Sequence, residues 1–216
     1  MGNVDLINKT YKYHGFLKVL HLLSLKAVNK ILPFKILTCV LITEMKAVSK
    51  ESDSKFKYLF LDEHQLKNFA ENQDYELPAS FVESALQRGD ECLGIVDDGE
   101  LVGYGWYSND DTLTDLHQLK FCFDQSYMYA YKGFTKTEYR GQRLQGNRLQ
   151  SALNHYHEKG YLGIIYYIES DNYDSLKSCF RMGFKVIGSI VVLKAFGKVY
   201  HFNSKSALRH NVRLSE

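Results

Sequence analysis

The sequence of 216 residues lacks the features that mark several classes of protein. Its four cysteines, Cys39, Cys92, Cys122 and Cys179, are far apart and form no Cys-x-x-Cys pair. This spacing supports neither a zinc site nor a disulfide framework, and it fits a reducing cytoplasm. Uncharged apolar runs such as residues 36–43 are much shorter than the roughly 20 residues of a membrane-spanning helix. No secretion signal is recognisable, so we expect a cytoplasmic protein without a metal site.

The charge and composition are those of an ordinary globular protein. The net charge of +2 is too small to indicate nucleic-acid binding by itself. Hydrophobic residues make up 45% of the chain, which is enough for a sizeable core. The length predicts one domain with a terminal extension. We expect a helical extension over residues 1–34, a main domain over residues 35–203 and a polar tail over residues 204–216.

The N-terminal extension is basic and amphipathic. Residues 6–43 contain six lysines and no acidic residue, and apolar side chains recur between residues 16 and 32 at three- and four-residue spacings. This pattern predicts one helix that ends at Pro33. Two interpretations are open: residues 12–32 lie on an acidic membrane surface or acidic partner, or the helix packs on the main domain or in a dimer contact.

Between residues 35 and 110, periodicity and turn residues predict five elements. They are a strand over 35–43, helices over 62–72 and 78–88, and hairpin strands over 92–96 and 100–108. The hairpin turn is Asp97-Asp98-Gly99. Gly103 and Gly105 alternate with Tyr104 and Trp106 in its second strand. Residues 109–126 are irregular and acidic, and they either line a cleft for a cationic group or are solvated loop residues.

The stretch from residue 127 to residue 160 has the composition of a phosphate-binding strand, turn and helix. A strand over 127–135 leads into a helix that starts with Arg140-Gly141-Gln142-Arg143-Leu144-Gln145-Gly146. Backbone N–H groups at a helix N-terminus carry partial positive charge, glycine permits close approach, and arginine adds a forked charged donor. A solvated helix start has a similar composition, so both interpretations are open for this cluster alone.

The later elements complete an order that resembles a known family. They are a strand over 163–168, a helix capped by Asp171-Asn172, and strands over 184–196 and 198–202. Together with the hairpin DDGELVGYGW, the helix start at residues 140–146 and the segment IIYYIESDNYDSLKSCFRMGF, this order resembles the GNAT family of N-acyltransferases. The resemblance covers roughly residues 36–203.

The resemblance implies an α/β (α+β) fold. A central mixed, mostly antiparallel sheet would be flanked by helices and would splay at an acyl-coenzyme A cleft. The implied function is transfer of an acetyl or other short acyl group from acyl-coenzyme A, such as acetyl-CoA, to a primary amine by direct attack. Two alternatives stay open: a non-catalytic module that only binds acyl-coenzyme A, and a membrane- or partner-associated protein that acts through its N-terminal helix.

The resemblance also implies which residues bind the cofactor. Residues 140–146 would hold the pyrophosphate of coenzyme A, although Arg143 and Gln145 stand where the family usually has glycine or a small residue. Backbone N–H groups near Phe134 and Thr135 would polarise the thioester carbonyl. Asn172 and Ser175 would contact the pantetheine or phosphate arm; the alternative is that Asn172 only caps the helix and Ser175 only packs.

Proton transfer needs a base for the amine and an acid for the leaving thiolate. Glu169, just after the strand IIYYI, is the first candidate for the base; the alternative is a surface carboxylate. Cys179 stands where many family members have a tyrosine that protonates the thiolate. Cys179 itself, a tyrosine or an ordered water would supply this proton, and a buried cysteine is the alternative for Cys179. The tyrosine candidates are Tyr129, Tyr131 and Tyr173.

Overall fold

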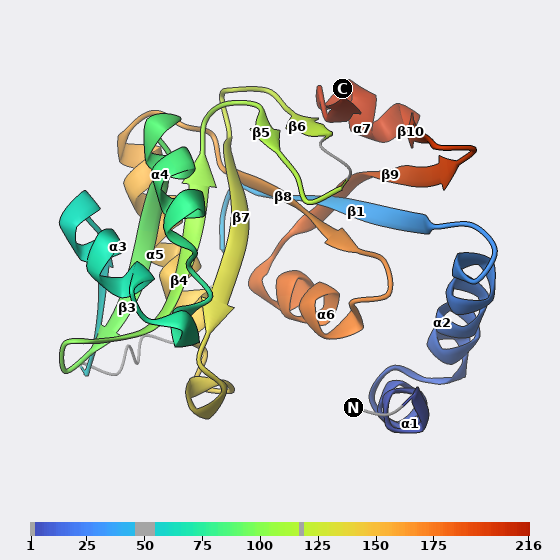
Figure 1. Ribbon diagram of the computed structural model, residues 1–216, viewed down its shortest axis with the longest axis horizontal. Coiled ribbons are helices and arrows are strands. Elements are labelled where there is room, and N and C mark those ends of the chain that lie inside the picture. Colours follow the sequence, from blue (N-terminus) through green and yellow to red (C-terminus); the bar gives the residue numbers. More distant parts are fainter. Residues whose placement is uncertain (1–2, 46–54, 117–118) are drawn as a thin grey trace. The chain divides into compact units, whose positions relative to one another are not determined.

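A computed structural model describes residues 3–45, 55–116 and 119–216 (Figure 1). The chain divides into two compact units. Unit 1 comprises Met1–Val40, Leu113–Cys122 and Tyr167–Glu216, and unit 2 comprises Leu41–Thr112 and Phe123–Tyr166. The strands β1 (Phe34–Ile42) and β8 (Ile164–Glu169) run through both units.

Unit 2 is a sheet with helices on both faces. Its strand order is β1-β8-β7-β4-β3-β2, with β2 (Phe56–Phe60), β3 (Glu91–Asp97), β4 (Glu100–Ser108) and β7 (Met128–Thr135). The pairs β2–β3, β3–β4 and β4–β7 are antiparallel, whereas β7–β8 is parallel. The hairpin turn has φ of 46° at Asp98 and 85° at Gly99. Two successive positive φ values are typical of the tight turns that favour Asp-Gly, so this predicted hairpin is confirmed.

The alternation of side chains along β4 assigns the two faces of this sheet. Tyr104 and Trp106 pack with α3 (Glu63–Ala70) and α4 (Ala79–Gln87), while Gly105 on the other face lies against α5 (Leu144–Glu158). Figure 1 shows α3 and α4 on one side of β3 and β4 and α5 on the other. The mostly antiparallel sheet flanked by helices matches the predicted fold class.

Unit 1 contains the strand order β10-β9-β1-β8, with β9 (Lys185–Ala195) and β10 (Lys198–Asn203), and the helix α6 (Tyr173–Met182). A second small sheet has the order β11-β6-β5, formed by β11 (Arg213–Ser215), β6 (Lys120–Cys122) and β5 (Thr112–Leu113). The helices α1 (Asn3–His14) and α2 (Phe16–Asn29) precede β1. No helix within the described ranges is long and apolar enough to cross a membrane.

Three expectations from the sequence are corrected. The single N-terminal helix is two helices, because Gly15 has φ of 83° and ψ of 173°, which ends one helix and begins the next. Residues 204–216, expected as a polar tail, form α7 (Lys205–Arg209) and β11, with Ala207, Val212 and Leu214 buried. The sequence also predicts no strand between residues 43 and 62, whereas β2 lies there; residues 46–54 are outside the described ranges.

Candidate functional site

The strand β7 carries a bulge at its centre. Its register with β4 shifts between the pairs Gly105–Gly133 and Trp106–Tyr131, which leaves Lys132 as the extra residue. Lys132 has φ of 40°, a left-handed conformation that is uncommon outside glycine. Bulges of this kind re-aim backbone groups and recur next to active sites. Within the described ranges, in contrast, β7 pairs with β8 at Met128–Ile164 and Tyr129–Ile165, before the bulge.

The backbone groups after the bulge alternate between two directions. Lys136 N donates to Val102 O at 2.9 Å. In an antiparallel pair every second residue directs its backbone groups to the same partner, so the N–H group of Phe134 also points toward β4. Gly133 and Thr135 then direct their backbone groups to the opposite edge. In agreement, Thr135 O lies on that edge and accepts a hydrogen bond from Arg140 Nε at 3.1 Å. The open edge of β7 thus presents the N–H groups of Gly133 and Thr135.

The connection from β7 to α5 contains the predicted phosphate-binding residues. After a 3₁₀ turn over Thr137–Tyr139, residues 140–143 are exposed, and α5 begins at Leu144. Gly141 has φ of 86° and Arg143 has φ of 58°. Arg143 therefore keeps the left-handed conformation that glycine adopts most easily, at a cost of roughly 1–2 kcal/mol for a residue with a side chain.

The start of α5 is fixed in place but lacks negative charge. Leu144 is buried with Phe56, Ile95 and Val102. Arg143 is the N-cap and makes no capping hydrogen bond with its side chain, and the first turn contains no acidic residue. Gln145 is exposed and Gly146 is half-buried. The first N–H groups of a helix without a side-chain cap are available to an anion.

The other predicted site residues lie in unit 1. Glu169 ends β8, and its carboxylate accepts a hydrogen bond from Lys35 Nζ at 2.6 Å; both side chains are partly exposed. Asn172 is the N-cap of α6, and its Oδ1 accepts from Ser175 N at 3.2 Å. The interpretation of Asn172 as a helix cap is therefore confirmed, and a second role in binding stays a prediction. Cys179 is buried in α6.

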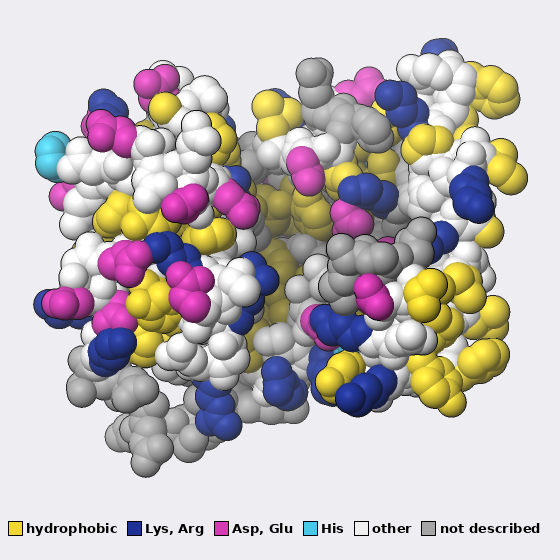
Figure 2. Space-filling model, turned by 60° about the horizontal axis from the view of Figure 1, so that its bottom comes forward, with side chains coloured by type: hydrophobic (Ala, Val, Ile, Leu, Met, Phe, Trp, Pro, Cys, Tyr) yellow, Lys and Arg dark blue, Asp and Glu magenta, His cyan; other side chains and the backbone are white. Residues whose placement is uncertain are grey.

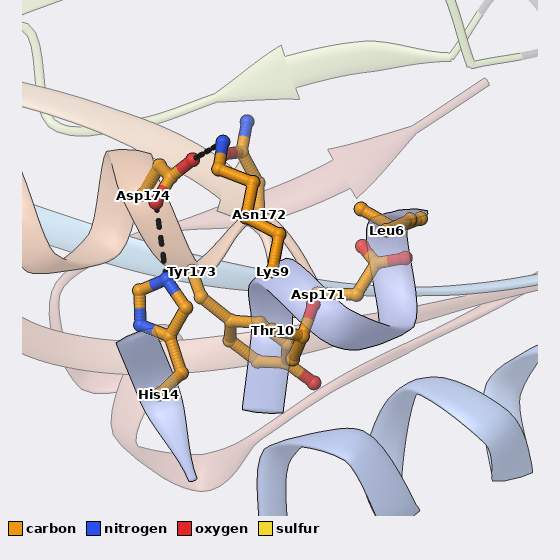
Figure 3. A pocket seen from close by; sticks show the side chains of 8 residues that line it. All are labelled: Leu6, Lys9, Thr10, His14, Asp171, Asn172, Tyr173 and Asp174. Carbon is orange, nitrogen blue, oxygen red and sulfur yellow. Dashed lines mark hydrogen bonds and ion pairs between the residues drawn. The ribbon is translucent and has the colours of Figure 1, made fainter. Parts of the chain in front are cut away.

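A cavity of about 280 Å³ lies between α1 and the N-terminus of α6 (Figure 3). Lys9 Nζ lies 2.6 Å from Asp174 Oδ2, and His14 Nε2 lies 3.0 Å from Asp174 Oδ1. Asn172 and Tyr173 are the residues of this cavity that the sequence predicted as candidate site residues. The cavity is lined by Leu6, Lys9, Thr10, His14, Asp171, Asn172, Tyr173 and Asp174.

Two of the three tyrosines considered as proton donors, Tyr131 and Tyr173, are engaged in hydrogen bonds. Tyr131 donates to Asp90 Oδ2, and Arg88 bonds to both groups. Burial raises the pKa of Tyr131, and the negative charge of Asp90 raises it further. Burial also raises the pKa of Tyr173, whose hydroxyl lies 2.7 Å from His21 Nδ1 and donates to Lys18 O. A phenol with a raised pKa is a weaker acid, so these contacts disfavour both residues as the donor.

Arg148 is the functional candidate that sequence reasoning missed. It lies on the buried side of α5 and is only 7% exposed. Its Nη1 donates to the Tyr107 hydroxyl at 3.1 Å. The alternation of Gly103 and Gly105 with aromatic residues was the available signal, because it predicts a sheet face without side chains, on which a long side chain can lie.

Comparisons with known proteins agree on the fold. No protein-family model matches the sequence, and no curated protein is significantly similar to it. A Drosophila protein of solved structure is similar with a TM-score of 0.53 and 14% identity, covering 85% of this chain and 58% of that chain. A putative acetyltransferase of the GNAT family from Novosphingobium aromaticivorans is similar with a TM-score of 0.52 and 12% identity, covering 73% and 62%.

A third similar structure is the GCN5-related N-acetyltransferase-like protein from Streptococcus suis, with a TM-score of 0.51 and 11% identity, covering 82% of this chain and 67% of that chain. The chain spans only about three fifths of the length of the first two proteins. Identities at this level establish a common fold rather than a common reaction. The chain therefore has the fold of the GNAT acetyltransferases, as the order of its sequence motifs predicts.

Proposed function

We propose that this protein transfers an acetyl or other short acyl group from acyl-coenzyme A to a primary amine. The observation that supports this most is the connection between β7 and α5. There, the left-handed residues Gly141 and Arg143 precede a helix start that has no acidic residue, and Arg140 is tied to the end of β7. This arrangement combines helix N–H groups with exposed arginines, which suits a pyrophosphate.

The open edge of β7 would hold the reacting end of the donor. The N–H groups of Gly133 and Thr135 would donate to the thioester carbonyl and to the oxyanion that forms during attack. Phe134 and Thr135 were the two residues expected to hold the thioester carbonyl. In this proposal Thr135 donates its backbone N–H group, whereas the ring of Phe134 packs on Tyr104 with centroids 5.3 Å apart.

Glu169 and Cys179 are proposed for the proton transfers. Glu169, partly exposed at the end of β8, would accept the proton of the amine, directly or through a water. Cys179 would protonate the thiolate of coenzyme A, unless an ordered water does so. Because titration of a base makes the rate rise with pH, a Glu169→Gln protein with an unchanged pH–rate profile would remove Glu169 from the mechanism.

Arg140→Glu tests the binding of the pyrophosphate. Replacing the exposed guanidinium by a carboxylate sets a negative charge against the ligand, so the dissociation constant for coenzyme A should rise at least about tenfold. Isothermal titration calorimetry measures this change, and the exposed Arg209 of α7 offers a matched charge reversal, Arg209→Glu, that should leave it unchanged. An unchanged dissociation constant for Arg140→Glu would show that this loop does not hold the pyrophosphate.

Turnover separates the enzyme from a binding module. Acetyl-CoA should release coenzyme A in the presence of at least one of a diamine, an amino sugar and a peptide amine. Saturable binding of acetyl-CoA without release for any amine would favour the non-catalytic alternative.

The N-terminal helices support a second, compatible function: attachment to an anionic membrane surface. In α2, Val19, Leu22 and Leu25 are buried, but the opposite face is apolar and exposed. Figure 2 shows hydrophobic side chains gathered on the side where Figure 1 draws α2. The exposed apolar residues of this segment, each with its exposed fraction, are Phe16 (65%), Leu17 (77%), Leu20 (52%), Leu23 (43%), Val28 (41%) and Ile31 (89%).

The charge of this segment favours a lipid surface over a second copy of the chain. Residues 6–43 carry six lysines and no acidic residue, so pairing two copies through α2 would bring like charges together. Lys9 and Lys35 pair with Asp174 and Glu169 within the chain. Anionic lipids would attract the other lysines of this segment while the apolar face enters the interface. The double substitution Leu17→Glu/Leu20→Glu should weaken binding to phosphatidylserine vesicles by roughly tenfold or more.

Phe196 provides the control for this experiment. It is fully exposed in the turn between β9 and β10, so Phe196→Glu should leave vesicle binding intact. Sedimentation with vesicles measures binding of all three proteins. If the wild-type chain ignores the vesicles but forms a dimer that Leu17→Glu/Leu20→Glu disrupts, the exposed face is a dimer contact instead.

A further inference from the structure

Arg148 places a permanent positive charge beneath the two central strands of unit 2. Its side chain reaches from α5 to the pair Gly105–Gly133 on β4 and β7. A Cβ atom at Gly105 would overlap Arg148 Nη1, and a Cβ atom at Gly133 would lie 3.6 Å from Nη2. The guanidinium therefore occupies space that exists because residue 105 is a glycine, whereas Gly133 only borders that space.

The charge of Arg148 has little compensation. Its guanidinium carries five N–H donors and does not lose its proton. Among the described residues, its guanidinium makes one hydrogen bond, to the Tyr107 hydroxyl. It also lies over the face of the Tyr107 ring, with Cζ 5.8 Å from the ring centroid. No ion pair joins it to a carboxylate in the part of the chain that the structure describes. A buried charge without a counter-ion is costly, so a ligand that brings negative charge is favoured.

The position of this charge beside β7 points to the thioester oxygen of the acyl donor as the atom that the guanidinium would contact. Nη2 lies against Gly133, whose N–H group faces the open edge of β7 just after the bulge at Lys132. If the Gly133 N–H group holds the thioester oxygen at this edge, we expect that oxygen to lie within reach of Nη2. Attack of the amine forms the C–N bond and moves an electron pair onto that oxygen. Collapse restores the carbonyl and breaks the C–S bond; the attacking nitrogen releases one proton, and the departing thiolate takes one.

We propose that Arg148 is a catalytic residue that contacts the thioester oxygen of the acyl donor and stabilises the oxyanion formed during transfer. This role rests on the proposed acyl transfer. A neutral carbonyl gains less from the guanidinium than an oxyanion does, so Arg148 acts mainly on the transition state. Its removal should lower the catalytic constant about 10²-fold while the affinity for acetyl-CoA changes less than about threefold.

A spectroscopic measurement tests this role without knowledge of the amine. The carbonyl stretching band of acetyl-CoA labelled with ¹³C at the thioester carbon is recorded free and bound to the full-length chain. Because a donor weakens the C=O bond, binding to the wild type should lower the frequency. In Arg148→Met the shift should fall to less than half, and in Arg148→Lys, which keeps the charge, part of it should return.

Two further measurements separate catalysis from packing. Tyr107→Phe removes the hydroxyl that accepts from Nη1 but keeps the charge, so its band should stay near that of the wild type. If Arg148→Met lowers the thermal midpoint but leaves the band unchanged, Arg148 only supports the strands and the proposal is wrong. If the wild type does not bind acetyl-CoA, the proposed function itself fails. Normal binding with an unchanged band in Arg148→Met overturns the role of Arg148 alone.

Discussion

At the scale of single residues, backbone conformation and buried charge distinguish the candidate site. Lys132 and Arg143 both adopt left-handed conformations, one at the bulge in β7 and the other at the start of α5. Arg148 lies on two glycines that face each other across β4 and β7. Strained non-glycine residues and buried charges persist only where the surrounding structure holds them, and they cluster at functional sites.

Alanine should destabilise the protein more at Gly105 on β4 than at Gly133 on β7. Gly105→Ala should destabilise the protein by about 1–3 kcal/mol, because the new methyl group overlaps Arg148 Nη1. Gly133→Ala should cost less than about 1 kcal/mol, because its nearest contacts are at 3.6 and 3.9 Å. Urea unfolding followed by circular dichroism measures both.

The double substitution Gly105→Ala/Arg148→Met shows whether the overlap is the cause. If it is, removal of the guanidinium should recover part of the lost stability, and the two changes should not be additive. Strict additivity would mean that Gly105 matters for another reason, such as the conformation of β4.

At the scale of elements, polar contacts hold α1 and α2 against α6. Lys9 and His14 contact Asp174, and Tyr173 donates to Lys18 O. The hydrogen bond from Lys9 and, to a lesser extent, that from His14 hold the pKa of Asp174 below its usual value. A carboxylate with a lowered pKa stabilises the folded form above its usual pKa of about 3.9, and this contribution is lost as the pH falls further.

Acid should therefore loosen α1 through Asp174. In Asp174→Asn the amides of residues 3–14 should exchange with deuterium faster than in the wild type at pH 6, because the ion pair with Lys9 is absent. The two proteins should converge only as the pH falls through the lowered pKa of Asp174, where the wild-type carboxylate also becomes neutral. Mass spectrometry at matched pH cancels the intrinsic pH dependence of exchange. A difference that does not shrink as the pH falls below the usual pKa of an aspartate, about 3.9, would assign the effect to another group.

The lysine–carboxylate pair in α3 serves as a control for the pair of Lys9 with Asp174. Glu63 and Lys67 are 2.6 Å apart at i and i+4 and are largely exposed. Glu63→Gln should leave exchange of α1 unchanged at every pH. Exposed helix pairs contribute only about 0.3–0.5 kcal/mol, so little change is expected in α3 either.

At the scale of the whole molecule, the two units share β1 and β8. Neither unit can lose these strands without breaking the sheet of the other, because each strand continues from one into the other. We expect the units to unfold together. Each unit contains a buried cysteine that reports on it: Cys39 in unit 1 and Cys92 in unit 2.

Alkylation of these cysteines tests joint unfolding. Burial raises the pKa of Cys39 to about 12 and also raises that of Cys92, so neither thiol should react with iodoacetamide at pH 8 while folded. Pulses at increasing urea concentrations, analysed by peptide mass, should yield the same midpoint for both cysteines. Two separate midpoints would show that the units unfold independently.

The sequence was sufficient where local chemistry decides the structure. Asp98-Gly99 specified the tight hairpin turn, and Asp62 and Asn172 cap their helices as residues of their types do. The order of elements predicted the fold that the similar solved structures share. Local patterns failed where apolar residues are few and separated, as in α7 and β11, which Ala207, Val212 and Leu214 hold in the core.

By itself, then, the sequence determined most of the helices and strands and the exposed connection at residues 140–146, because turns, caps and periodicity act over a few neighbouring residues. Only the tertiary structure decided that Arg143 would take the place of a glycine in a left-handed conformation, and that α1 and α2 would contact Tyr173 and Asp174. It also decided the position of Arg148, since a glycine on β4, the neighbouring strand β7 and the helix α5 must meet to bury that charge.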